Sequence, residues 1–339
     1  MDDVLKVRDL SVTFHAEEGP VRAVQDVSFS LQAGRTLGLV GESGSGKSVT
    51  TKALVKLLPD AAQIGAQSAI GYRDKVGTWL DIASMPAKGS ALRRLRGGEI
   101  GMIFQEPMAS FSPVYTIGAH MVETIRLHRN MSRRAARTTA IGMLAKVGIA
   151  NPEERFDAYA FALSGGMRQR AMIALALSAE PKLLIADEPT TALDVTIQAQ
   201  VLKLMQALQQ QLGMAMIFIS HDLGVIAQIA DEIAVMYLGT IVERGPAREV
   251  LRTPHHPYTQ ALLAAIPKID ALEARMTPVP GDLPSPSDRP TGCAFRTRCP
   301  KAIPGVCAHV VPAETAPAPG RAVRCHLFQD AASVRVSAP

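Results

Sequence analysis

The sequence predicts an α/β protein whose core is a mostly parallel sheet covered by helices on both faces. Four short runs are apolar throughout, which is typical of strands buried on both faces of such a sheet: residues 36–40, 100–104, 183–186 and 216–219. Helical periodicity lies between and after them, at residues 48–58, 117–147, 166–179, 195–212 and 222–229. Strands and helices that alternate along a chain indicate βαβ units and therefore a parallel sheet.

The first and last parts of the chain have a different character. Residues 4–14 and 24–31 alternate apolar and polar side chains, which predicts antiparallel strands. Residues 60–100 are poorly patterned, with one strand expected near Ile70 and another near Trp79. After about residue 245 proline becomes dense, and all four cysteines lie in this last part. We therefore expect one large domain over residues 1–250 and a small irregular extension over 251–339.

Composition restricts the class of protein. The chain has 339 residues, of which 47% are hydrophobic and 20% charged, so a sizeable core is expected and disorder is not. A net charge of +5 is too mild for a nucleic-acid surface. No apolar run approaches the ~20 residues of a membrane span, and the N-terminus lacks the features of a signal peptide. We expect a cytosolic protein, in which metal ligation by cysteine is favoured over disulfides.

The first chemical motif is a glycine-rich loop that follows the apolar strand at residues 36–40. It ends in Lys47 and Ser48 and fits the phosphate-loop pattern, whose backbone N–H groups surround phosphates at a helix N-terminus. Lys47 is expected to reach the β- and γ-phosphates and Ser48 to bind Mg²⁺. A simple turn would explain neither the Lys-Ser ending nor the strand before it. The expected ATP-binding residues here are Gly41, Glu42, Ser43, Gly44, Ser45, Gly46, Lys47, Ser48 and Val49.

The second motif is an acidic pair, Asp187 and Glu188, at the end of the apolar strand 183–186. The carboxyl ends of parallel strands meet at one edge of a sheet, beside the phosphate loop. Asp187 is expected to hold Mg²⁺, and Glu188 to act as the general base on the attacking water. Acidic pairs are also common in solvated turns, so the prediction depends on the phosphate loop.

The third motif, Ser164-Gly165-Gly166 before a polar helix, resembles the signature of ABC ATPases. Locally, Ser164 is a good helix N-cap, and the glycine amides can form a second anion cradle. In this family the signature faces the γ-phosphate held by the opposite subunit. Two domains thus enclose two ATP molecules head to tail, and an inserted helical subdomain, here about 108–165, passes the movement to a channel.

Other residues match further elements of the same family. Gln105 resembles the glutamine that senses Mg²⁺ and the γ-phosphate, and Asp194 resembles the acid of the D-loop that begins at Ala192. His221 resembles the switch histidine that acts in catalysis. Phe14 matches the aromatic residue that stacks on adenine, although an alternating strand also places Phe in a core.

The last part of the chain resembles the C-terminal extension of ATP-binding subunits of oligopeptide/dipeptide importers. The matching segments are residues 256–263, 280–284, 292–300 and 323–327. The chain departs from these relatives at residues 159–162 and 110–113, both within the expected helical subdomain. The implied fold is a P-loop ABC nucleotide-binding domain with an antiparallel N-terminal sheet, a helical subdomain and a small Cys/Pro-rich extension.

Four cysteines fall within one short window of the extension: Cys293, Cys299, Cys307 and Cys325. Their spacing is wider than the two-residue gaps typical of zinc sites. Some importer subunits with this pattern carry a [4Fe–4S] cluster, and four thiolates are the right number of ligands. A cluster is therefore the favoured interpretation, zinc is the alternative, and unligated thiols come third.

The resemblance implies an ATPase that drives import of di- or oligopeptides from the cytoplasmic face of the inner membrane, which it reaches only through a permease. The implied partners are a second ATPase subunit (a copy or a paralogue), two transmembrane permease subunits and an extracytoplasmic solute-binding protein, with no nucleic acid. Nickel, glutathione or oligosaccharide import remains an alternative. A soluble ABC ATPase of DNA repair or translation would carry coiled-coil inserts or tandem units, and a non-catalytic regulator would not retain Lys47, Asp187, Glu188 and His221.

Overall fold

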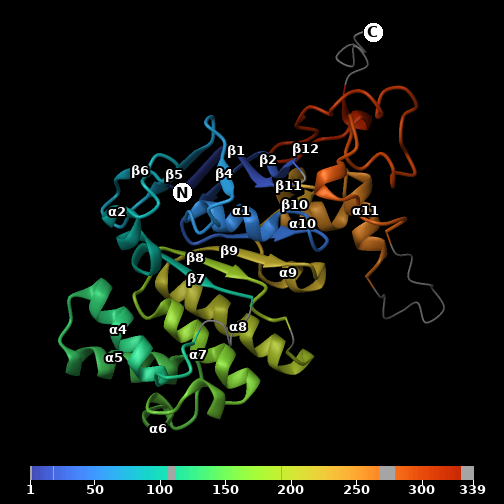
Figure 1. Cartoon of the computed structure of the whole chain (residues 1–339). Coiled ribbons are helices and arrows are strands. Elements are labelled where there is room, and N and C mark those ends of the chain that lie inside the picture. The colour runs from blue at the N-terminus through green and yellow to red at the C-terminus, as the bar shows by residue number, and fades with distance from the viewer. Residues whose placement is uncertain (1, 18, 106–110, 192, 267–278, 330–339) are drawn as a thin grey trace. The chain divides into compact units, whose positions relative to one another are not determined.

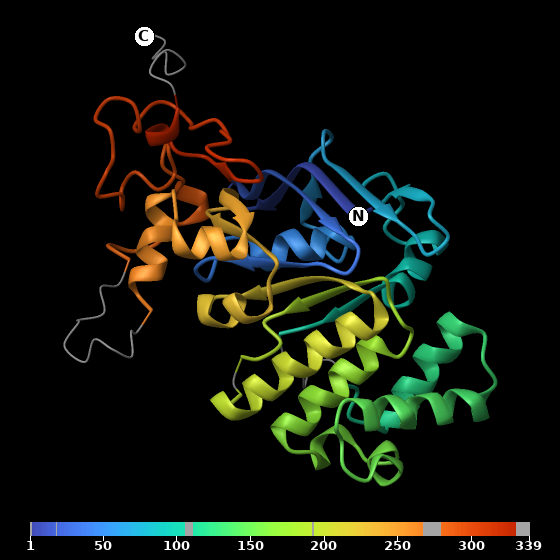
Figure 2. The same ribbon diagram turned by 180° about the vertical axis from the view of Figure 1, so that it is seen from behind.

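A computed structural model describes residues 2–17, 19–105, 111–191, 193–266 and 279–329 (Figures 1 and 2). The chain forms two compact units. The first contains residues 1–6, 30–36 and 70–219, and the second contains residues 7–29, 37–69 and 220–339. The predicted division of the sequence near residue 250 stays a prediction.

The first unit is built on three parallel strands, β7 (Ile100–Ile103), β8 (Leu183–Asp187) and β9 (Ala215–Ser220). Their register pairs Ile100 with Leu183, and Asp187 with Ile219. Every residue of β8 and β9 is buried, as the continuous apolar runs predicted. Helices α7 (Gly165–Leu177) and α8 (Val195–Leu212) lie along these strands (Figure 1).

The helical part of this unit contains α4 (Ile117–Arg129), α5 (Arg133–Lys146) and α6 (Pro152–Phe156). The sequence predicted one helical stretch over 117–147, but Asn130 takes a left-handed conformation and ends α4. Ser132 then caps α5 through the backbone N–H of Ala135. Phe156 packs so closely on Gly118 that an added Cβ would lie 2.3 Å from its ring, so only glycine fits there.

The remaining elements of the first unit are short. Strands β5 (Ala69–Arg73) and β6 (Trp79–Asp81) pair antiparallel, at the two places where strands were expected. Helix α2 (Ser90–Arg94) leads through a kinked turn, Leu95–Glu99, into β7. The Tyr72 hydroxyl donates to the Glu99 carboxylate at 3.1 Å, which joins β5 to this turn.

The second unit contains most of the N-terminal sheet, in which β1 (Asp3–Ala16) is hydrogen-bonded to β2 (Gly19–Gln32) and to β4 (Ala62–Ile64). It also contains β3 (Thr36–Val40), which runs parallel to β10 (Glu232–Tyr237). The antiparallel N-terminal sheet and the α/β core confirm the predicted fold class.

The elements that complete the second unit are β11, the helices and the last strand. Strand β11 (Thr240–Pro246) pairs antiparallel with β10, and β12 (Ala322–Val323) pairs antiparallel with β11. The helices are α1 (Lys47–Leu54), α9 (Leu223–Ile229), α10 (Ala247–Arg252) and α11 (Pro257–Ala264). Helix α1 was expected to reach residue 58 but ends at Leu54, because Lys56 takes a positive φ and Pro59 disfavours a helical residue before it.

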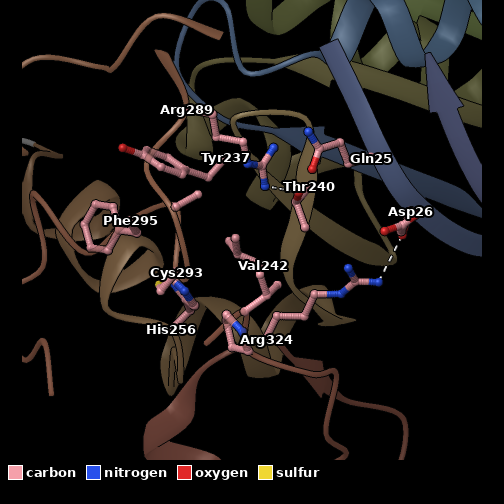
Figure 3. A pocket seen from close by; sticks show the side chains of 14 residues that line it. Gln25, Asp26, Tyr237, Thr240, Val242, His256, Arg289, Cys293, Phe295 and Arg324 are labelled. Atoms are coloured by element: carbon pink, nitrogen blue, oxygen red, sulfur yellow. Dashed lines mark hydrogen bonds between the residues drawn. The ribbon is translucent and has the colours of Figure 1, made fainter. Parts of the chain in front are cut away.

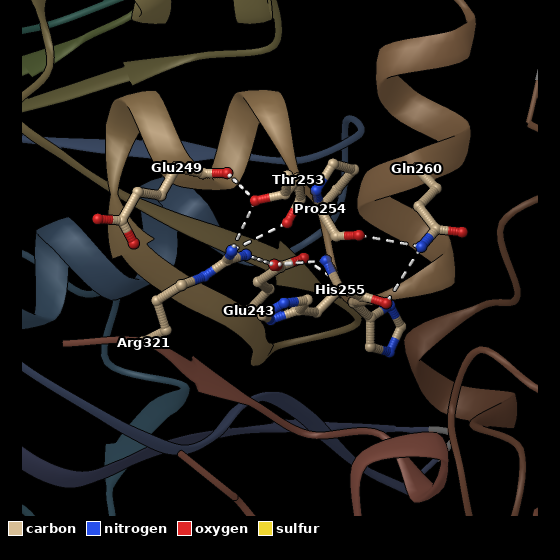
Figure 4. Close-up of polar contacts among 8 residues, drawn as sticks. Glu243, Glu249, Thr253, Pro254, His255, Gln260 and Arg321 are labelled. Carbon is tan, nitrogen blue, oxygen red and sulfur yellow. Dashed lines mark hydrogen bonds and ion pairs between the residues drawn. The ribbon is translucent and has the colours of Figure 1, made fainter. Parts of the chain in front are cut away.

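A buried polar network joins the extension to β11 (Figure 4). Arg321, in the last part of the chain, pairs with the Glu243 carboxylate at 2.5 Å, and both side chains are almost fully buried. The same carboxylate accepts the backbone N–H groups of His255 and His256 at 2.8 and 2.9 Å. Arg321 also donates to the Thr253 carbonyl. The extension is therefore held by specific polar contacts as well as by β12.

Candidate nucleotide-binding and hydrolysis site

The phosphate loop lies in the second unit, between β3 and α1. Gly46 takes φ +99° at the start of α1, and a Cβ there would lie 2.7 Å from the Ala23 carbonyl oxygen, so glycine is required. The buried Lys47 side chain donates to the Gly41 and Glu42 carbonyls at 2.7 and 2.8 Å. The loop and its lysine therefore form one hydrogen-bonded unit at the N-terminus of α1, where the helix dipole favours an anion.

Two other predicted residues belong to the same unit. Phe14, on β1, is paired with Ala62 of β4 and is half-buried, so part of its ring is accessible. His221 is exposed between β9 and α9. The next residue, Asp222, caps α9 by accepting the backbone N–H groups of Gly224 and Val225.

The first unit brings Gln105 and Glu188 together. The Gln105 side-chain amide donates to Glu188 Oε2 at 3.2 Å, and the Thr191 hydroxyl donates to the same oxygen at 3.0 Å. Glu188 has φ +47°, an uncommon conformation for a non-glycine residue, directly after the buried Asp187 at the end of β8. Strain of this kind at a strand end is typical of a functional carboxylate held in a set direction.

The signature segment also lies in the first unit. Ser164 caps α7 by accepting the Met167 backbone N–H at 3.4 Å, and both Ser164 and Gly165 are exposed. Asp194 caps α8 in the same way through Ile197. The exposed start of α7 is thus available to a ligand or to another subunit. Ala192 of the predicted D-loop and residues 106–110 lie outside the described residues.

Sequence reasoning missed two residues near Glu188. The buried Gln169 donates from its side-chain amide to the Pro189 carbonyl, which ties α7 to the residue after Glu188. Thr191 binds the Glu188 carboxylate directly. A hydroxyl three residues after the acid was a signal that could have identified Thr191. No local pattern indicated the partner of Gln169.

The four cysteines line one cavity in the extension, together with His256 and His326. All four are free thiols; Cys293, Cys307 and Cys325 are buried, and Cys299 is half-buried. Burial, with a smaller contribution from the neighbouring thiols, raises the pKa of Cys293 to about 11 and also raises the pKa values of Cys299 and Cys325. The thiol groups are therefore mutual neighbours around one space.

Two kinds of metal centre were expected at these cysteines, a [4Fe–4S] cluster and a zinc ion. Among the described residues, no group of three or more His, Cys, Asp or Glu side chains is placed around a single metal ion. The geometry of the described residues therefore shows neither the expected [4Fe–4S] cluster nor its zinc alternative. A cluster takes one thiolate at each of its irons, so its ligands surround a larger centre. The four cysteines that line the cavity match the number of thiolates that such a cluster takes.

The fold and the two sets of motif residues define an ATPase of the ABC type. Residues 24–191 match the ABC transporter family, and residues 242–307 match the oligopeptide/dipeptide transporter C-terminal region. The chain belongs to the family of ABC transporter ATP-binding proteins that carry this C-terminal region.

Individual relatives agree with this assignment over nearly the whole chain. The dipeptide transport ATP-binding proteins DppD of Bacillus subtilis and of Escherichia coli are each 44% identical over 327 residues. Both alignments cover 96% of this chain, and they cover 95% and 97% of those proteins. Among solved structures, the ATP-binding cassette MJ0796 with bound ADP and Pi matches with a TM-score of 0.63 at 23% identity. The match covers 72% of this chain and 99% of the MJ0796 chain, and it supports the fold.

The chain offers no candidate for a transmembrane helix in the part that the structure describes.

Proposed function

We propose that the chain is the ATP-hydrolysing subunit of an importer for di- or oligopeptides, attached to the cytoplasmic face of the inner membrane through a permease. The observation that carries this proposal is the coexistence of a Gln105–Glu188 catalytic pair with an extension matching the oligopeptide/dipeptide transporter region. The chain is also similar to relatives named for dipeptide transport over nearly their full length.

In the proposed reaction, separate residues bind the nucleotide, hold the metal ion and activate the attacking water. The loop N–H groups and Lys47 would bind the phosphates. Ser48, Gln105 and Asp187 are the residues that would hold Mg²⁺, which would neutralise phosphate charge. Glu188 accepts a proton from the attacking water, with its carboxylate oriented by Gln105 and Thr191. Phe14 contacts adenine, and His221 contacts the γ-phosphate region.

We infer that two ATPase subunits form each pair of sites, since Ser164 and Gly165 are exposed at the N-terminus of α7, next to the half-buried Gly166. That terminus, with Asp194 at the start of α8, would cover the γ-phosphate bound by the partner's loop. Closure with ATP and reopening after hydrolysis would then drive the permease. The second subunit is a copy or a paralogue, and an extracytoplasmic protein delivers the solute.

We also propose that Cys293, Cys299, Cys307 and Cys325 hold a [4Fe–4S] cluster. The support is the shared cavity with its four thiol donors. A cluster would connect the segment 293–307 to Cys325 and so stabilise a region with little regular secondary structure. Its role would be structural, because ATP-driven transport requires no electrons.

The decisive experiment measures solute-stimulated ATP hydrolysis in proteoliposomes that contain this chain with its permease and solute-binding protein. Di- and oligopeptides should stimulate hydrolysis and accumulate inside the vesicles. Glu188→Gln vesicles serve as the matched negative control. Stimulation by Ni²⁺, glutathione or oligosaccharides, and not by peptides, would overturn the peptide assignment while retaining the transport ATPase.

A further inference from the structure

The C-terminal extension contacts the phosphate loop directly at Glu42, within the second unit. The two terminal nitrogens of Arg298 donate to the two carboxylate oxygens of Glu42 at 2.7 and 2.9 Å. The Arg298 side chain is 3% exposed and that of Glu42 is 28% exposed. This fork-shaped pairing fixes both distance and orientation, as a lysine in the same place would not.

A second contact reaches the backbone of the same residue. The Glu42 backbone N–H donates to the Tyr258 hydroxyl at 2.9 Å, and Tyr258 is fully buried in α11. The Tyr258 ring packs against Tyr237 and Phe295 at centroid distances of 4.7 and 5.3 Å. Figure 3 shows Tyr237 at the end of β10 and Phe295 beside it in the extension. The hydroxyl is therefore held in place by a rigid aromatic cluster.

A third contact comes from the segment at residues 280–284. Leu283 lies beside Gly44, with its Cδ2 3.6 Å from the position of a Cβ on that glycine. Arg298 also donates from Nε to the Pro280 carbonyl at 2.7 Å, which fixes the guanidinium that pairs with Glu42. Three separate segments of the extension thus converge on the first half of the phosphate loop.

Glu42 links these contacts to the phosphate-binding lysine. Its backbone carbonyl accepts from Lys47 Nζ at 2.8 Å, while its N–H and its carboxylate are held by the extension. A loop rich in glycine and serine loses much conformational freedom when it closes around a ligand. Contacts that hold such a loop in advance reduce that loss and therefore increase affinity.

We propose that the extension positions the phosphate loop for ATP, with Arg298 and Tyr258 as positioning residues that act through Glu42. The extension therefore sets the affinity of the loop for nucleotide, in addition to any role in assembly. The proposal rests on the proposed function of Gly41–Ser48 as the ATP phosphate site. The proposal gives a function to the pairing of the Glu42 carboxylate with Arg298 of the extension.

The test is a double-mutant cycle on the full-length chain, read by titration with a fluorescent ATP analogue and Mg²⁺. Arg298→Ala and Glu42→Ala should each weaken binding by about tenfold, within the usual size of coupling between sites. The double variant should bind no more weakly than either single variant, because both remove the same contact. In the assembled transporter, KM for ATP should rise while kcat at saturating ATP stays close to wild type.

Two further variants separate positioning from folding. Tyr258→Phe keeps the ring and removes only the hydroxyl that accepts the Glu42 N–H, so it should weaken binding while the chain unfolds at nearly the wild-type temperature. Arg296→Ala is the matched control, since this neighbouring arginine donates to Thr291 within the extension. It should bind nucleotide as wild type does.

The outcomes separate this proposal from the one on which it rests. If Lys47→Ala abolishes binding while Arg298→Ala, Glu42→Ala and Tyr258→Phe all bind as wild type does, the positioning role is wrong and the phosphate site stands. The positioning role would also be contradicted if the loss of binding free energy in the double variant equalled the sum of the two single losses. Two residues that act through one contact do not have independent effects. If Lys47→Ala binds ATP normally, the assignment of the phosphate site itself fails.

Discussion

The side-chain amide of Gln169 donates a hydrogen bond to the backbone carbonyl of Pro189. Gln169 lies in α7, which begins with the signature residues, and Pro189 directly follows Glu188. Gln169 is 3% exposed, so neither group has water as an alternative partner. This hydrogen bond therefore joins α7 directly to the backbone beside the proposed general base.

This hydrogen bond predicts that the protein becomes less stable when the Gln169 side-chain amide is removed. Gln169→Leu keeps the approximate volume but leaves the buried Pro189 carbonyl unsatisfied, which costs about 1–3 kcal/mol. The free energy of unfolding should fall by that amount in denaturant titrations, and transporter ATPase should decrease. Gln210→Leu, the same change at an exposed position of α8, is the control and should leave both quantities nearly unchanged. Equal stability of the two variants would contradict the role given to Gln169.

The geometry around Glu188 predicts that one substitution can greatly reduce ATP hydrolysis and leave ATP binding intact. Glu188→Gln retains a side chain that Gln105 and Thr191 can still approach, but it removes the proton acceptor. ATP binding should therefore persist, while turnover in the reconstituted transporter falls by at least about a hundredfold, the lower range for general-base catalysis. Trapped ATP should also increase the dimer fraction in size-exclusion chromatography. Turnover comparable to wild type would exclude Glu188 as the base.

The exposed signature predicts that one subunit completes the site of another. A Ser164→Arg subunit and a Lys47→Ala subunit should each be inactive alone, because each lesion affects both sites of a homodimer. In a mixture, one composite site collects both lesions and the other has neither, so part of the activity should return. The measurement is ATPase activity across mixing ratios. Full activity in a strictly monomeric preparation would contradict shared sites, and a transporter that needs a paralogue would show no rescue by self-mixing.

The cysteine cavity predicts the metal content of the protein. Anaerobic purification should yield about four irons with matching sulfide per chain, since four thiolates suit a [4Fe–4S] cluster. Cys307→Ser should lose iron and unfold at lower temperature, because the extension loses a bond that closes its loops. Its ATP turnover should change less than that of Glu188→Gln.

The control for this measurement is Ser287→Ala, which changes an exposed hydroxyl of the extension away from the cavity. It should retain full iron content. One zinc per chain would favour the alternative ligand, and the absence of both metals would leave the cysteines as ordinary buried thiols.

Local patterns were sufficient to predict β3, β7, β8 and β9 of the core and most of the helices between them. The phosphate loop is specified by adjacent residues whose glycines and terminal Lys-Ser act over a few positions, as seen at Gly46 and Lys47. Likewise, α8 begins and ends at the predicted residues because Asp194 caps it and Gly213 ends it. These features depend on short-range hydrogen bonding and on backbone conformation, which neighbouring residues determine.

Contacts between distant residues were decided only by the tertiary structure. Arg298 and Glu42 are 256 positions apart, and each was visible in its own motif without any sign of the other. The same holds for Gln169 with Pro189, and for the cavity that gathers the four cysteines. Side-chain pairing across such separations depends on how the strands and helices pack, because one sequence gives no information on which surfaces meet. The chemistry of ATP hydrolysis was therefore predictable from local motifs, whereas the attachment of the extension to the phosphate loop was not.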